Sequence, residues 1–90
     1  MHQDVDVGDY LLTINVESKF DLPDADKASG FNVRVIVTRH DGTPVRGSMH
    51  AEDSGELTGG HGPYATMGDA IAHGEAWGRH FVARVLGGAL

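Results

Sequence analysis

Apolar residues near the end of the chain, between Thr66 and Leu86, recur at intervals of three and four. This spacing places them on one stripe of an α-helix. The stripe would consist of Met67, Ala70, Ile71, Gly74, Trp77, Gly78, Phe81, Val82 and Val85. The opposite side would carry Asp69, His73, Glu75, Arg79, His80 and Arg84. We therefore predict an amphipathic helix that lies across a sheet formed by the preceding residues.

Capping residues mark both ends of this helix. Thr66 is suited to the N-cap position, with Asp69 three residues later as an aspartate variant of the capping box. Gly87 and Gly88 would end it. Glu75 and Arg79 are one turn apart and can form an ion pair.

Two glycines, Gly74 and Gly78, lie one turn apart on the predicted apolar stripe. A glycine inside a helix costs about 1 kcal/mol relative to alanine. We expect this cost to be offset by a close approach of the helix backbone to the sheet, with Trp77 and Phe81 filling the flanks.

Alternation of apolar and polar residues predicts two strands before the helix. In residues 9–17 the inward side would be Tyr10, Leu12, Ile14 and Val16. In residues 31–39 it would be Phe31, Val33, Val35 and Val37, with Asn32, Arg34, Ile36 and Thr38 facing outward. Residues 1–8 are expected to form a flexible tail, and residues 18–30 a loop.

The turn after the second strand predicts a third strand. His40-Asp41-Gly42 is typical of a three-residue hairpin loop with Gly42 in the left-handed conformation. Residues 43–51 would then pair Val37 with Val45, Val35 with Gly47, Val33 with Met49 and Phe31 with Ala51. A two-residue turn would instead place Arg46, Ser48 and His50 opposite the valines, so the alternation favours the three-residue loop. Residues 56–58 are a candidate for a short extra strand, which the pattern does not decide.

These elements predict an α+β fold. We expect a three-stranded antiparallel β-meander with one C-terminal α-helix packed on one face, in two layers. A single domain would cover residues 9–88, behind the tail of residues 1–8.

Composition narrows the class of protein. The 90 residues contain no cysteine, which excludes a disulfide framework and suits a reducing cytoplasm. They carry a net charge of −6. No signal peptide or membrane-spanning run is visible, so we expect a cytoplasmic protein without membrane partners. Residues 31–46 are an exception to the acidity, because they contain three arginines and only one acidic residue, an aspartate. The outer sheet face is therefore expected to be locally basic.

Two stretches carry a family resemblance. The sequence Tyr64-Ala65-Thr66-Met67-Gly68-Asp69-Ala70 resembles the aromatic-x-Thr-x-x-acidic-Ala step that opens the helix of AP2-type and integrase arm-binding DNA modules. Residues 59–82 are similar to the C-terminal half of small proteobacterial β-β-β-α proteins that belong to families of unknown function. The DNA modules bind through arginines and aromatics of the open sheet face. Here that face would offer Arg34 and Arg46 without an aromatic, so nucleic acid is not our first expectation.

The outer sheet face is the candidate binding surface, with Asn32, Arg34, Arg46, Ser48 and His50 at its centre. We expect a non-enzymatic protein-interaction or assembly module that uses this face or the edge strand Tyr10–Glu17, with a protein partner or a second copy of the chain. The alternative is a binder of anionic ligands or nucleic acid through Arg34, Arg46 and His50.

Catalysis, metal and phosphate sites are not expected. Ser48, His50 and Glu52 would alternate along one strand, about 6.6 Å apart, which is too far for a nucleophile–base hydrogen bond. His73 and His80 would be separated by two helical turns, about 10.5 Å, so one ion could not easily take both. The glycine-rich residues 59–63 are not followed by the Gly-Lys-Ser/Thr of a phosphate loop. We expect no enzyme activity, no cofactor and no bound metal.

Overall fold

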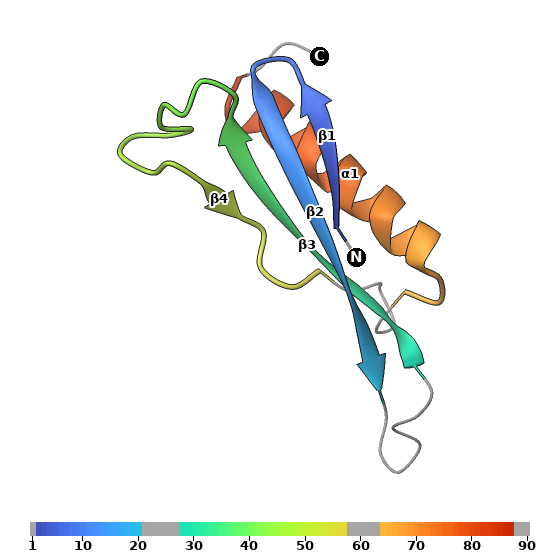
Figure 1. The fold of residues 1–90 in the computed structure, drawn as a ribbon. Coiled ribbons are helices and arrows are strands. Elements are labelled where there is room, and N and C mark those ends of the chain that lie inside the picture. Colours follow the sequence, from blue (N-terminus) through green and yellow to red (C-terminus); the bar gives the residue numbers. More distant parts are fainter. Residues whose placement is uncertain (1, 21–27, 58–63, 88–90) are drawn as a thin grey trace.

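The fold consists of an antiparallel sheet and one C-terminal helix (Figure 1). The computed structural model describes residues 2–20, 28–57 and 64–87. The elements are β1 (His2–Val7), β2 (Tyr10–Phe20), β3 (Ala28–Arg39), β4 (Glu52–Asp53) and α1 (Met67–Arg84). The predicted α+β class is confirmed. The predicted number of strands is wrong, because the sheet has four strands in the order β1-β2-β3-β4.

Strand β1 lies where we expected a flexible tail. It forms a hairpin with β2, in which Val7 pairs with Tyr10 and Val5 with Leu12. The two connecting residues begin with Gly8 at φ 58°, as in the type II′ turns that suit the twist of a hairpin. Val7 is buried in the core, so this strand contributes apolar contacts as well as backbone hydrogen bonds.

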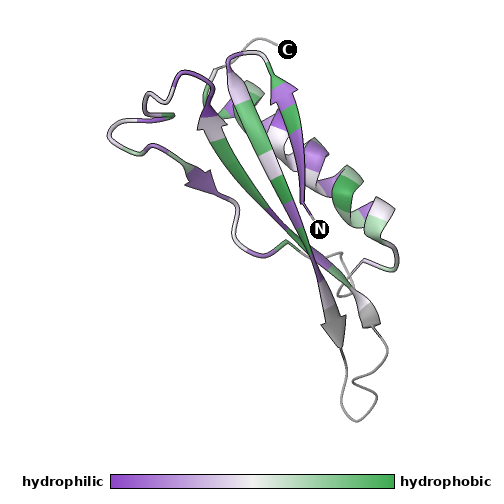
Figure 2. Ribbon diagram, viewed as in Figure 1, coloured by the Kyte–Doolittle hydropathy of each residue, from purple (hydrophilic) through white to green (hydrophobic). Residues whose placement is uncertain are grey.

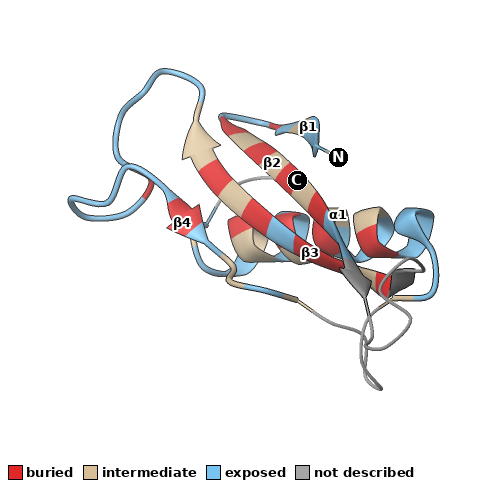
Figure 3. Cartoon of the chain, turned by 60° about the horizontal axis from the view of Figure 1, so that its bottom comes forward, coloured by how far each residue is buried: buried red, intermediate tan, exposed pale blue. Residues whose placement is uncertain are grey.

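Strands β2 and β3 form the centre of the sheet, and their predicted alternation is confirmed. Ile14 pairs with Val35 and Leu12 with Val37. Apolar and polar positions alternate along both strands (Figure 2), and buried positions follow the same period (Figure 3). The buried apolar side chains of the two strands are Tyr10, Leu12, Ile14, Val16, Val33, Val35 and Val37, whereas Phe31 is partly buried; the polar Asn32 of β3 is buried as well.

Helix α1 begins as predicted. The Asp69 backbone N–H donates to Thr66 Oγ1 over 3.0 Å, which confirms Thr66 as the N-cap. The helix ends at Arg84, before Gly87 adopts φ 68°. The buried stripe is shorter than predicted, because Met67 and Val85 at its two ends are 38% and 46% exposed.

The two helix glycines contact the sheet directly. A Cβ atom on Gly78 would lie 2.5 Å from Leu12 Cδ1, and one on Gly74 would lie 2.9 Å from Val33 Cγ2. Trp77 and Phe81 stack with their ring centroids 5.1 Å apart and are partly buried against the core. The predicted close approach with aromatic flanks is confirmed.

The segment after β3 differs from the prediction. Gly42 has φ 78° and its N–H donates to the Arg39 carbonyl over 3.1 Å, so the expected left-handed glycine is confirmed. Asp41 accepts hydrogen bonds from the Thr43 hydroxyl and backbone N–H, which lower the pKa of its carboxyl. Residues 43–51, which follow, do not pair with β3.

The predicted third strand at residues 43–51 is therefore wrong. Arg46 and Met49 pair with each other in a turn, and Gly47 adopts φ 56°. Pro44 lacks a backbone N–H, and a left-handed Gly47 interrupts an extended chain, so this stretch is poorly suited to a strand.

Residues after position 51 pair with β3 in place of the predicted third strand. Val37 pairs with Glu52, Val33 with Leu57 and Phe31 with Tyr64, in contrast to the predicted partners Val45, Met49 and Ala51. Val35, for which we predicted Gly47, instead donates its N–H to Ser54 Oγ over 2.9 Å. The extra strand left open at residues 56–58 is represented by the single bridge at Leu57, while residue 58 lies outside the described residues.

Candidate functional site

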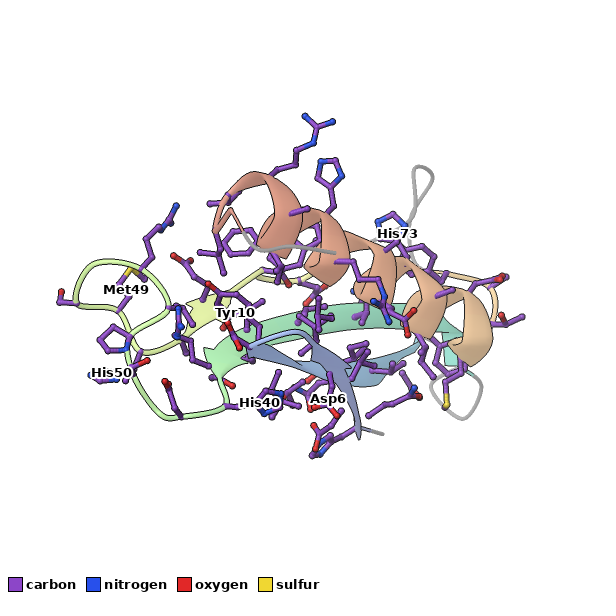
Figure 4. The ribbon with its side chains drawn as sticks, turned by 90° about the horizontal axis from the view of Figure 1, so that it is seen from above. Asp6, Tyr10, His40, Met49, His50 and His73 are labelled. Carbon is purple, nitrogen blue, oxygen red and sulfur yellow. The ribbon has the colours of Figure 1, made fainter. Side chains whose placement is uncertain are left out.

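The face of the sheet opposite the helix is the candidate site, which we call the open face. Residues directly paired across antiparallel strands share a face, so the register identifies its members. Of the residues that the structure describes, they are His2, Asp4, Asp6, Leu11, Thr13, Asn15, Glu17, Asn32, Arg34, Ile36, Thr38 and Asp53. Figure 4 shows Asp6 and its neighbour His40 on the side of the sheet away from the helix. Glu56 joins this face through a hydrogen bond from Asn32.

The open face is acidic, whereas we expected it to be basic. Among the side chains that the structure describes, its charged groups are Arg34 and the carboxylates of Asp4, Asp6, Glu17, Asp53 and Glu56. With neutral histidines this gives a net charge of −4. The expectation failed because β1 adds two aspartates to the face and β4 supplies Asp53, while the predicted third strand would have supplied Arg46 and His50.

Two of the five predicted binding residues lie on the open face. Asn32 is only 3% exposed, and its side-chain amide donates to Glu56 Oε1. Arg34 is exposed, with Nε 3.4 Å from Asp53 Oδ1. An ion pair between exposed side chains contributes only about 0–1 kcal/mol, so the Arg34 side chain can rearrange easily.

The other three predicted binding residues lie elsewhere. Arg46 Nη2 is 2.6 Å from Glu52 Oε1, and its guanidinium carbon is 6.0 Å from the centroid of the Phe81 ring, so this arginine lies beside the helix. Ser48 and His50 are exposed in the loop that follows β3, where His50 is labelled in Figure 4. Arg34, Arg46 and His50 therefore do not form one basic patch.

A hollow of about 370 Å³ opens on this face between the start of β1 and Glu56. Its lining residues are His2, Asn15, Val16, Glu17, Asn32, Val33, Arg34 and Glu56. Asn32 is its most buried polar side chain, and Asn32 Oδ1 has no hydrogen-bond partner within the described part of the chain. This hollow was not predictable from the sequence, because Glu56 follows Asn32 by 24 residues and its approach depends on how residues 40–57 fold.

Two histidine–aspartate contacts border the open face. His2 Nε2 lies 2.9 Å from Asp4 Oδ1, and His40 Nε2 lies 3.1 Å from Asp6 Oδ1. Within residues 2–20, 28–57 and 64–87, no group of three or more histidine or acidic side chains is placed to hold a metal ion. The glycine-rich residues 59–63 lie outside the described residues.

Ser48, His50 and Glu52 do not share a strand as their spacing had suggested. Only Glu52 belongs to β4, where it is buried and contacts Arg46. The other two side chains are exposed in the loop.

Comparisons with protein-family models, with curated proteins and with solved structures found no match for this chain. The resemblances to AP2-type and integrase modules, and to the proteobacterial β-β-β-α proteins, therefore stay predictions. In the described residues no helix is both long and apolar enough to cross a membrane.

Proposed function

We propose that this protein is a non-enzymatic interaction module whose open face binds a basic surface on a protein partner. The observation that carries the proposal is the charge of this face, where, among the described side chains, five carboxylates accompany a single arginine. Complementary charge speeds association and selects the partner. The proposal assumes the predicted two-layer arrangement, in which the helix covers one face and leaves the other to solvent.

The free edge of the sheet supports the same proposal. We expected Tyr10–Glu17 to be an edge strand, but β2 lies between β1 and β3, so β1 takes the edge position. An edge strand can accept an extended segment of a partner through backbone hydrogen bonds. Asp4 and Asp6 point from β1 onto the open face, where they would contact lysine or arginine side chains of such a segment.

The same charge argues against the other expected partners. Phosphate groups of nucleic acid would be repelled by the carboxylates, and the arginines of the alternative site are separated. A second copy of the chain would bring one acidic face against another. A basic protein surface is the partner that the described residues favour.

The test is an NMR titration of the ¹⁵N-labelled chain with oligolysine and, in parallel, with oligoglutamate. Oligolysine should shift the amide signals of β1 and of the open-face residues of β2 and β3, and oligoglutamate should not. The double variant Asp4→Asn/Asp6→Asn should bind oligolysine several-fold more weakly, and binding should weaken as salt is added.

A matched control is Asp69→Asn, which removes an exposed acid from the first turn of α1. This variant should bind oligolysine as the wild type does. An equal loss of affinity in Asp69→Asn, or shifts centred on the helix, would contradict the proposal.

A further inference from the structure

We infer that the hollow beside Asn32 receives one cationic N–H donor group, the ammonium of a lysine or the guanidinium of an arginine, from the partner. The inference rests on the proposed function and identifies where on the open face the main contact is made. Three observations support it. Asn32 Oδ1 is buried without a hydrogen-bond partner in the described residues, carboxylates line the same hollow, and the hollow has room for a side-chain end.

The orientation of the Asn32 amide determines what the hollow requires. Its nitrogen donates to Glu56 Oε1, and the opposite orientation would place two oxygens against each other. The oxygen is therefore left as an acceptor within a residue that is 97% buried, and it has no partner in the described residues. An unsatisfied buried acceptor is destabilising, and a ligand with an N–H group would satisfy it.

The groups around this oxygen favour a positive charge. Glu17 is the cross-strand neighbour of Asn32, and Glu56 lies on its other side, so two carboxylates line the hollow. Among the described lining residues Arg34 is the only arginine, and its Nε lies 3.4 Å from Asp53 Oδ1. An anion would meet the Glu17 carboxylate and the amide oxygen, whereas a cation can donate hydrogen bonds to both.

The size of the hollow fits the end of a side chain. Its volume of about 370 Å³ greatly exceeds the share of about 30 Å³ that one water occupies in the liquid. Ammonium groups and guanidinium groups carry several N–H donors, so either can bond to the Asn32 oxygen and a carboxylate together.

The inference is tested with small probes that carry a single charged group. The ¹⁵N-labelled wild type is titrated with n-butylammonium and n-butylguanidinium, with n-butanol as the uncharged control. Both cations should shift the Asn32 side-chain amide and the backbone amides of Glu17 and Arg34, and butanol should not. The cation with the lower Kd indicates whether lysine or arginine is the preferred side chain.

Variants locate the binding. Asn32→Leu removes the amide but keeps a buried side chain of similar size, and it should raise the Kd of the better cation about tenfold. Glu17→Gln changes an exposed side chain, so it should fold normally, and it should weaken the same cation several-fold. The matched control Asp69→Asn, in the first turn of α1 and outside the lining of the hollow, should keep the wild-type Kd for the small cations.

The outcomes separate this inference from the proposed function. If oligolysine binds the wild type while the small cations leave Asn32, Glu17 and Arg34 unshifted, the hollow is not the cation site and only this inference fails. The same conclusion follows if Glu17→Gln and Asn32→Leu bind the cations like the wild type. If the cations bind in the hollow but oligolysine does not bind, the proposed function fails.

Discussion

At the scale of single residues, the contact between Gly78 and Leu12 decides how closely the helix can lie on the sheet. Leu12 is fully buried, and three of its side-chain atoms lie within 3.2 Å of where a Gly78 Cβ would be. The side chain has no solvent to move into, so an added methyl group would have to displace the helix or repack the core.

We therefore expect Gly78→Ala to destabilise the protein. Overpacking costs about 1–3 kcal/mol, and the better helix propensity of alanine returns about 1 kcal/mol, so the free energy of unfolding should fall by up to about 2 kcal/mol. Urea unfolding measures this as a lower midpoint. The control is Gly68→Ala in the first turn, where the nearest atom to the new Cβ is Thr66 Oγ1 at 3.9 Å. That variant should be as stable as the wild type or more stable, and equal destabilisation of both would show that Gly78 is not held by packing.

Residue-scale features were predictable where their cause is local. The Thr66 cap was recognised because its partner Asp69 lies in the same turn. The two helix glycines were recognised because they lie one turn apart on the apolar stripe, although the residues that they contact, Leu12 and Val33, belong to the sheet. The burial of Asn32 was not recognisable, because an asparagine on the polar side of an alternating strand is normally exposed. Its partner Glu56 comes from a distant segment whose path depends on the loop after β3.

At the scale of elements, β1 and the segment after β3 show two different reasons for error. β1 did carry a signal, namely Val5 and Val7 before a two-residue Gly8-Asp9 connection, but its exposed acids resembled a solvated tail. The third strand was predicted by comparing two turn lengths, and neither allowed the chain to leave the sheet after Arg39 and return at Glu52, twelve intervening residues later. Alternation of apolar and polar residues identifies which side chains of a strand face the core. It does not identify which of several alternating segments pairs with a given edge of the sheet.

Strand β1 should protect the longer β2 from pairing with other chains. β2 has eleven residues and contains no proline, and without β1 it would present a free edge beside Leu12 and Ile14. We expect a truncation that removes residues 2–7 to form oligomers or aggregates at concentrations where the full chain does not. Light scattering across a concentration series measures this.

A milder change separates the protection of the edge from the loss of core contacts. Gly8→Val keeps every residue of β1 but strains the turn, because a β-branched residue rarely adopts φ near 58°. Amide exchange in β1 should become faster in this variant, with less aggregation than in the truncated chain. A truncated chain that stays monomeric would show that β1 has no protective role.

At the scale of the whole molecule, the uneven distribution of charge is the feature that links stability to the proposed function. The chain carries a net charge of −6, and the described open face alone accounts for −4. Like charges gathered on one side repel one another, so the free protein keeps an unfavourable field that a basic partner would relieve. The charge distribution that favours binding therefore slightly lowers the stability of the unbound protein.

Replacing Arg34 measures that field. Arg34→Gln takes the described open face from −4 to −5, while Arg84→Gln makes the same change in total charge at the last turn of the helix. At low ionic strength we expect Arg34→Gln to lower the free energy of unfolding by about 0.5–1 kcal/mol, and Arg84→Gln by a few tenths through the helix dipole. Raising the ionic strength from about 0.01 M to about 1 M shortens the Debye length from about 30 Å to about 3 Å, so most of the difference between the variants should disappear. If both variants respond equally to salt, Arg34 does not lie in a distinct acidic field, and the charge argument for a basic partner loses its basis.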